Sequence, residues 1–246
     1  MYPRRRGRWL RGLGLFIAGT LVLMVGGLVI NAHFDQSQKP EALPPTSLPT
    51  PPWDTTAPPT PSADTKKQPE LTGPVQVIQG TQLINGVYLG FPHSTVGAVS
   101  AADEYATQLV STLDPDRAAA VMRLVADPSF SDGPAQAAQG AVDDRAALGV
   151  PANGLVPPGF SFQLVPVECQ IEDVSPDKLT VLLLSDFIST TPGQGTTTGI
   201  GVFPVALHWS TGDWKVLPVP PRDYSAITAE PGSAQAASLG WQELQP

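Results

Sequence analysis

The pattern of apolar and polar residues divides the chain into three parts: an apolar run near the N-terminus, a stretch without apolar periodicity, and a C-terminal part with regular spacing. Residues 13–30 carry no charge over eighteen positions. At about 1.5 Å per residue this run makes a helix of roughly 27 Å, which approaches the ~30 Å thickness of a hydrocarbon core. The pattern therefore predicts a transmembrane helix over residues 13–32.

Charge predicts the orientation of this helix. All five basic residues before residue 12 are arginines, and no acid occurs before Asp35. Because positive residues favour the cytoplasmic side, residues 1–12 are expected to form a cytoplasmic tail, with the rest outside the cytoplasm. A cleaved signal peptide is the alternative, but its apolar core would be only about 7 to 15 residues long. We therefore favour an uncleaved, single-pass anchor in the cell membrane.

Residues 33–74 are expected to form a disordered, proline-rich linker. The stretch from residue 35 to residue 74 contains eleven prolines, separated mainly by threonine, serine and aspartate. Proline removes backbone donors and favours extended backbone, so such a sequence behaves as a semi-rigid spacer. The linker can hold a folded domain away from the membrane.

Apolar residues recur at helical spacing in the first half of the predicted extracytoplasmic domain, residues 75–224. Ser94 or Thr95 is a candidate N-cap, and Asp114 followed by proline is a typical helix start. Gly149 is a typical C-terminal stop. The three predicted helices span residues 94–114, 114–127 and 132–149.

The spacing then changes to two, which is typical of β-strands. The first strand is interrupted at Pro166, the second is apolar on both faces, and the last two are joined through Thr211 and Gly212. The predicted strands span residues 160–174, 178–190, 200–210 and 213–219. Helices followed by an antiparallel meander predict an α+β domain in which a curved sheet wraps around a long helix. Residues 225–246 are expected to form a C-terminal tail.

Two tryptophans mark the most regular stretch, residues 201–216. Trp209 and Trp214 flank a short polar turn, and alternation places Trp209 on the apolar face of its strand with His208 on the other. Cross-strand aromatic pairs stabilise sheets, which favours a hairpin in the core. A functional surface is the alternative interpretation. The candidate partner or pocket surface therefore comprises Tyr105, His208, Trp209 and Trp214.

The sequence lacks the familiar catalytic signatures. No G-x-S-x-G, H-E-x-x-H, P-loop or paired-cysteine motif occurs, and a pair of His93 with Asp103 or Glu104 is the only acid–base combination suggested. The single cysteine, Cys169, is expected to be a buried small hydrophobe. From Asp35 onward nine basic residues face twenty-two acids, a net charge of −13, which argues against nucleic-acid binding. We therefore expect no enzyme activity, no cofactor and no metal site.

Three stretches carry a resemblance to a known family: LDPDRAAAVMRLVADPSF, QLVPVECQIEDVSPDKLTVLLLSDF and GVFPVALHWSTGDWKVLPVP. Together with the basic tail, the apolar run and the linker, they resemble the bitopic VirB-type core component of conjugative type IV secretion systems. The closest similarity is to actinobacterial proteins encoded with mobile elements, and it covers residues 88–221. The resemblance implies a nuclear transport factor 2-like cone, in which three helices pack on a four-stranded antiparallel sheet.

The resemblance also implies a function. It predicts a non-enzymatic membrane-anchored scaffold or assembly component of a cell-envelope transport machine. The expected partners are the membrane, other envelope or secretion proteins, and further copies of the chain. Two alternatives stay open: an accessory protein of an Mce-type lipid importer, which has the same plan, and a small-molecule-binding or enzymatic cone-fold domain. All of these assignments rest on analogy of architecture.

Overall fold

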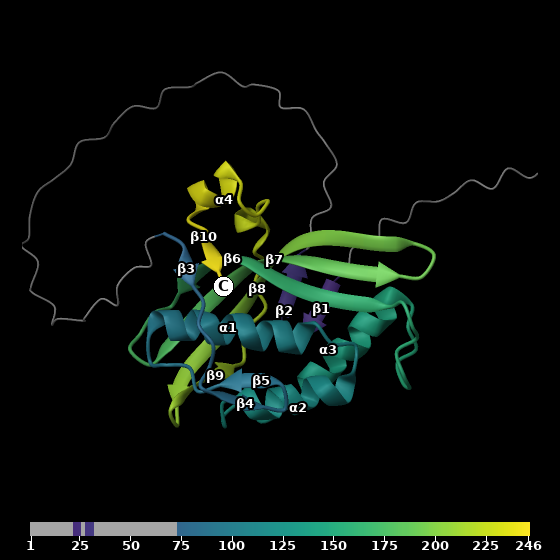
Figure 1. Cartoon of the computed structure of the whole chain (residues 1–246), viewed down its shortest axis with the longest axis horizontal. Coiled ribbons are helices and arrows are strands. Elements are labelled where there is room, and N and C mark those ends of the chain that lie inside the picture. Colours follow the sequence, from purple (N-terminus) through teal and green to yellow (C-terminus); the bar gives the residue numbers. More distant parts are fainter. Residues whose placement is uncertain (1–21, 26–27, 32–72) are drawn as a thin grey trace, which may run out of the picture.

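The computed structural model describes residues 22–25, 28–31 and 73–246 (Figure 1). The predicted cytoplasmic tail, most of the predicted membrane helix and nearly all of the linker lie outside the described residues. The described part of residues 13–32 differs from the prediction, because Val22–Val25 (β1) and Leu28–Asn31 (β2) are strands that pair antiparallel. Two glycines separate them in the sequence. None of the helices in the described residues has the length and apolar character needed to span a membrane.

A curled, mixed sheet forms the centre of the domain (Figure 1). Three long strands and one short strand follow one another as an antiparallel meander, with a bulge after Pro166. A fifth strand, from the C-terminus, pairs antiparallel with the first strand of the meander. The sixth strand, at residues 75–76, pairs in parallel with this fifth strand. In spatial order the strands are β3 (Val75–Gln76), β10 (Gln242–Gln245), β6 (Ser161–Glu172), β7 (Lys178–Thr191), β8 (Gly195–Ser210) and β9 (Asp213–Leu217).

This sheet corrects the predicted fold class. The prediction was a nuclear transport factor 2-like cone of three helices on a four-stranded antiparallel sheet, whereas the sheet has six strands and contains a parallel pair. The additional strands come from both ends of the described domain. Residues 225–246, expected to form a tail, contribute helix α4 (Ala234–Leu239) and β10. Buried Val75 and Trp241 hold these ends in place.

Three helices lie close to their predicted positions. They are α1 (Thr95–Val110), α2 (Pro115–Val125) and α3 (Gly133–Leu148). The Ser94 side chain caps α1 by accepting a hydrogen bond from the Gly97 amide, and Asp114 caps α2 in the same way. Gly149 ends α3 in the left-handed region at φ 72°, where glycine is favoured. Local sequence signals therefore define these helix ends.

A second small sheet precedes α1. Gln82–Ile84 (β4) and Val87–Leu89 (β5) pair antiparallel across Asn85 and Gly86, which have φ angles of 51° and 77°. Asn-Gly is the preferred pair for this type I′ turn. Val87 and Leu89 of β5 are buried, whereas every residue of β4 is exposed. The hairpin thus packs on the domain through β5, and its turn is held to α2 by a hydrogen bond from the Arg117 guanidinium to the Asn85 carbonyl at 2.7 Å.

Apolar layers cover both faces of the central sheet. Helices α1 to α3 pack on one face, where Tyr105, Leu207 and Trp214 are fully buried. The C-terminal segment packs on the other face, with Tyr224 and Trp241 against three apolar side chains of the sheet. Those side chains are Leu182, Leu184 and Val202. The strand that is apolar on both faces in the sequence, β7, is therefore buried on both faces.

Candidate functional site

The two tryptophans pair across the β8–β9 hairpin. Trp209 lies directly opposite Trp214, with ring centroids 5.4 Å apart and an interplanar angle of 68°. The intervening Thr211 and Gly212 have φ angles of 55° and 84°, as a two-residue I′ turn requires. Trp214 is completely buried, and Trp209 is half-buried at the edge of the core. Both tryptophans belong to the hairpin that the alternation predicted.

His93 adds a third ring to this aromatic pair. Its imidazole stacks on Trp209 at a centroid distance of 4.4 Å and an interplanar angle of 7°. Its Nε2 lies 3.0 Å from the Pro176 carbonyl oxygen and 3.1 Å from an oxygen of Asp177. The suggested pairing of His93 with acids of α1 is therefore wrong, and Glu104 instead accepts a hydrogen bond from the Tyr88 amide. His93 links the loop before α1 to the turn between β6 and β7.

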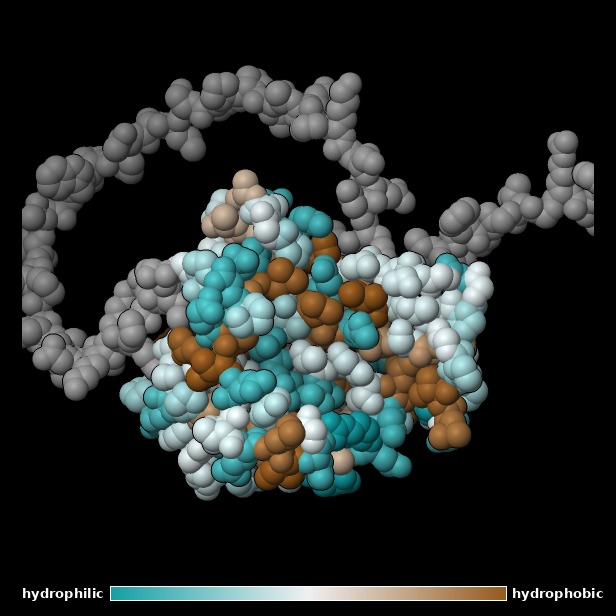
Figure 2. Space-filling model, in the orientation of Figure 1, coloured by the Kyte–Doolittle hydropathy of each residue, from teal (hydrophilic) through white to brown (hydrophobic). Residues whose placement is uncertain are grey.

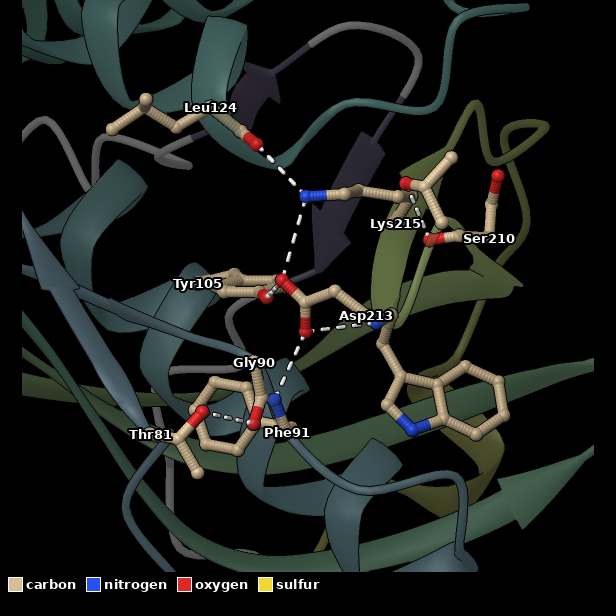
Figure 3. A network of polar contacts seen from close by, with 10 residues as sticks. Thr81, Gly90, Phe91, Tyr105, Leu124, Ser210, Asp213 and Lys215 are labelled. Carbon is tan, nitrogen blue, oxygen red and sulfur yellow. Dashed lines mark hydrogen bonds and ion pairs between the residues drawn. The ribbon is translucent and has the colours of Figure 1, made fainter.

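Asp213 is the centre of a buried polar network beside the tryptophans (Figure 3). Its carboxylate accepts hydrogen bonds from the Phe91 amide at 3.0 Å, the Tyr105 hydroxyl at 3.1 Å and the Trp214 amide at 2.9 Å. The Lys215 ammonium lies 3.4 Å away and also donates to the carbonyl of Leu124, in α2. Burial, and then the Asp213 carboxylate, raise the pKa of Tyr105 far above its ordinary value, so its hydroxyl stays a donor. The network joins the loop after β5, two helices and the hairpin.

His208 forms a separate polar contact with the end of α2. Its Nδ1 lies 2.8 Å from an Asp127 oxygen, and the Ser129 hydroxyl and amide donate to the other oxygen of that carboxylate. Burial raises the pKa of Asp127, but hydrogen bonds from Ser129 and His208 outweigh this effect and lower it to about 2. The ionised carboxylate therefore orients His208, with Nδ1 as the donor.

The His208–Asp127 pair has the geometry of a general base, because a carboxylate holds Nδ1 and leaves Nε2 available. In residues 73–246, however, no hydroxyl or thiol hydrogen-bonds to Nε2, and Ser129 binds the carboxylate instead. The Asp127 amide also donates to the carbonyl of Val216, in β9. The pair therefore fastens the end of α2 to the sheet.

Other titratable groups are buried without converging on one place. Cys169 is fully buried, as predicted, and burial followed by the charges of Asp103 and Glu168 raises its pKa to about 12. Burial raises the pKa of Asp103 to about 6 and that of Asp144 to about 7. Over the described part of the chain, no group of three or more histidine, cysteine, aspartate or glutamate side chains could hold a metal ion.

An apolar pocket lies between the helices and the β8–β9 side of the sheet. Tyr105 contributes to its wall, together with apolar side chains of α1, α2, α3, β8 and β9. His208, Trp209 and Trp214 do not line it. The four candidate residues therefore belong to three places: the pocket wall, the contact with Asp127, and the aromatic hairpin.

Comparison with known families decides where the chain belongs. The model of a domain of unknown function, DUF8175, matches residues 32–239 and so covers the described domain almost completely. The chain belongs to the DUF8175 family. No curated protein and no solved structure matches the chain. Membership of the family therefore assigns a domain without assigning an activity.

Two polar contacts were not predicted from the sequence. Asp127 was interpreted only as the end of a helix, and Asp213 only as the first residue of a strand after a short turn. Their partners are distant in the sequence, since Asp127 binds His208 and Asp213 binds Phe91. The sequence offered one local signal for a buried acid: Asp213 stands next to Trp214 at the start of an apolar strand.

Proposed function

We propose that the protein is a non-enzymatic, membrane-anchored assembly component of a cell-envelope transport machine. The observation that carries this proposal is the exposed apolar strand β4. Leu83 and Ile84 are 59% and 39% exposed, and nearby Ile78 is 40% exposed. We call these three residues the β4 edge. Apolar groups on a free strand edge are typical of a surface that another chain covers.

The β4 edge offers backbone groups as well as side chains. Within residues 73–246, β4 pairs only with β5, so its outer side is free to accept another strand. The remaining large exposed hydrophobics of the domain, Leu155, Val165 and Val174, are separated from one another in the sequence. Figure 2 likewise shows several separate apolar patches on the visible face. The β4 edge is thus the best candidate for an ordered protein contact.

The polar groups of the domain support assembly over catalysis. Asp213, His208 and His93 all bind partners within the chain, and each contact joins separate elements of the fold. A catalytic site would instead bring titratable groups together in a pocket with room for a substrate. Among the described residues that line the apolar pocket, Tyr105 alone is titratable, and its hydroxyl binds Asp213.

Attachment to the membrane is supported by the sequence alone, through the charge and hydropathy of residues 1–32, because the structure has paired strands at Val22–Val25 and Leu28–Asn31. The acidic domain would then lie outside the cytoplasm. A test is mass spectrometry of protein extracted from membranes. Residues before residue 30 should remain attached, whereas a mature N-terminus near His33 would refute an uncleaved anchor.

A conjugative secretion machine is the narrower form of the proposal, and it is supported only by the sequence resemblance. An Mce-type lipid importer is the alternative assembly. Crosslinking in the native cells tests both. A photo-crosslinking residue at Leu83 of the full-length chain should give a discrete adduct with an envelope protein or with a second copy. Leu155 is the matched control, because it is 96% exposed but lies outside the β4 edge.

The identity of the adduct distinguishes the two machines, since mass spectrometry would find either secretion components or lipid-import components. Leu83→Asp should weaken the assembly, whereas Leu155→Asp should not. Identical adducts from the two positions would contradict a role for the β4 edge. Loss of transport in His208→Ala with assembly intact would instead favour an enzyme.

A further inference from the structure

The apolar pocket has the lining of a small-molecule site, but it is small enough to hold only a group of a few heavy atoms. Its cavity volume is about 40 Å³. A water molecule needs about 10–15 Å³ on this scale, so the pocket has room for roughly three waters or a short organic group. Leu109, Met122, Phe130, Phe203 and Val205 contribute to the wall. Such a surface holds water poorly and favours an apolar occupant.

One polar atom behind the wall lacks a partner among the described residues. The Gln136 side chain lines the pocket, and its Oε1 is closed off from the cavity and has no hydrogen bond within that part of the chain. Its Nε2 donates to the carboxylate of Asp132 at 2.6 Å, which fixes the assignment of the two amide atoms, because a carboxylate only accepts from an amide. A buried acceptor without a donor is unfavourable, so a ligand that donates one hydrogen bond would relieve it.

We propose that this pocket binds a small amphiphile: a short alkyl chain or ring that carries one hydroxyl or N–H group. The apolar part lies against Met122, Phe130 and Phe203, and the polar group donates to Oε1 of Gln136 after a small rotation of the amide. The site involves none of the residues of the β4 edge, and it is independent of the proposed assembly role.

Two probes of nearly equal shape test the hydrogen bond. 2-Butanol has a donor, whereas 2-butanone has only an acceptor. The reporter is the methyl group of Met122 in the full-length chain, labelled with ¹³C and held in lipid nanodiscs. Only two other methionines, Met1 and Met24, occur in the sequence. The signal that disappears in Met122→Ile identifies the reporter.

The expected result is a saturable shift of the Met122 signal, with 2-butanol binding about three- to tenfold more tightly than 2-butanone. Gln136→Leu keeps the size of the side chain and removes the acceptor, so it should abolish this preference. Val219→Phe, which enlarges a side chain of the pocket wall, should weaken both probes.

Three results would overturn the proposal: a shift that rises linearly with both probes, equal affinities in the wild type, or a preference for 2-butanol that persists in Gln136→Leu. If Val219→Phe fails to fold, the comparison between wild type and Gln136→Leu decides alone. The binding results do not depend on the crosslinking at Leu83, so the pocket proposal and the assembly proposal can fail separately.

Discussion

Replacing Asp213 tests whether the buried network stabilises the fold. In Asp213→Ala, the Phe91 and Trp214 amides and the Tyr105 hydroxyl lose their acceptor inside the domain. Each buried, unsatisfied donor costs about 1–3 kcal/mol, so the free energy of unfolding should fall by about 3–9 kcal/mol. Domains of this kind are stable by only about 5–15 kcal/mol, and the loss is therefore a large fraction of the total.

The conservative variant separates charge from shape. Asp213→Asn keeps one oxygen for the two backbone amides, but its NH₂ group cannot accept from Tyr105 or from Lys215. The loss of these charge-assisted contacts should cost about 1.5–3 kcal/mol. Tyr105→Phe removes a single hydrogen bond and should cost about 0.5–1.5 kcal/mol. The double variant should cost less than the sum of the two, because both substitutions remove the same contact.

Urea unfolding of the fragment 73–246 measures these differences, provided that the m-value is unchanged between variants. The matched comparison is the double-mutant cycle of Tyr105→Phe and Asp213→Asn. Additivity within about 0.5 kcal/mol would show that the two side chains do not interact energetically. An Asp213→Ala variant as stable as the wild type would refute the account of the network altogether.

The remaining predictions concern the same domain. Fragment 73–246 should unfold in a single cooperative transition by circular dichroism. Trp214→Ala, which empties a fully buried position, should cost about 3–5 kcal/mol, and Trp209→Ala at the half-buried edge should cost less. The pKa of Asp127 falls from 3.8 to about 2 on folding, so its contribution to the free energy of unfolding should be complete above about pH 5 and lost towards pH 2. Thermal melts of wild type and Asp127→Asn should therefore converge as the pH falls. The pKa of Asp144 is raised to about 7, so the stability of the wild type should fall as the pH rises from about 4 to 7. The stability of Asp144→Asn relative to the wild type should therefore be higher at pH 8 than at pH 5.

Local order in this domain could be predicted because its signals are local. Ser94 and Asp114 cap helices through contacts with the next few residues, and alternating residues identify the long strands. Asn85-Gly86 is an equally strong local signal for a hairpin, and the structure has one there, between β4 and β5.

The architecture of the sheet depends on contacts that the spacing of residues does not encode. The apolar residues on both faces of β7 required a second covering layer, and the C-terminal Trp241 was available to provide it. The sequence does not show which edge of the sheet β10 joins, because that pairing brings together Gln242 and Cys169, which lie far apart in the sequence. The same limit applies to the site, since Asp213 and Phe91 meet only after the chain has folded.

The aromatic hairpin acquires a role once its contacts are followed to the β4 edge. The segment directly after β5 is fastened to β8 and β9 at three successive residues: the Phe91 amide donates to Asp213, the Pro92 carbonyl accepts from the Trp214 indole at 2.9 Å, and His93 stacks on Trp209. The β4–β5 hairpin is joined to the domain through this segment, as well as through β5 and the contact of Arg117 with the Asn85 carbonyl. We therefore expect Asp213, buried Trp214 and half-buried Trp209 to help hold Leu83 in place. On this account the most regular stretch of the sequence supports the proposed contact surface and is not the surface itself.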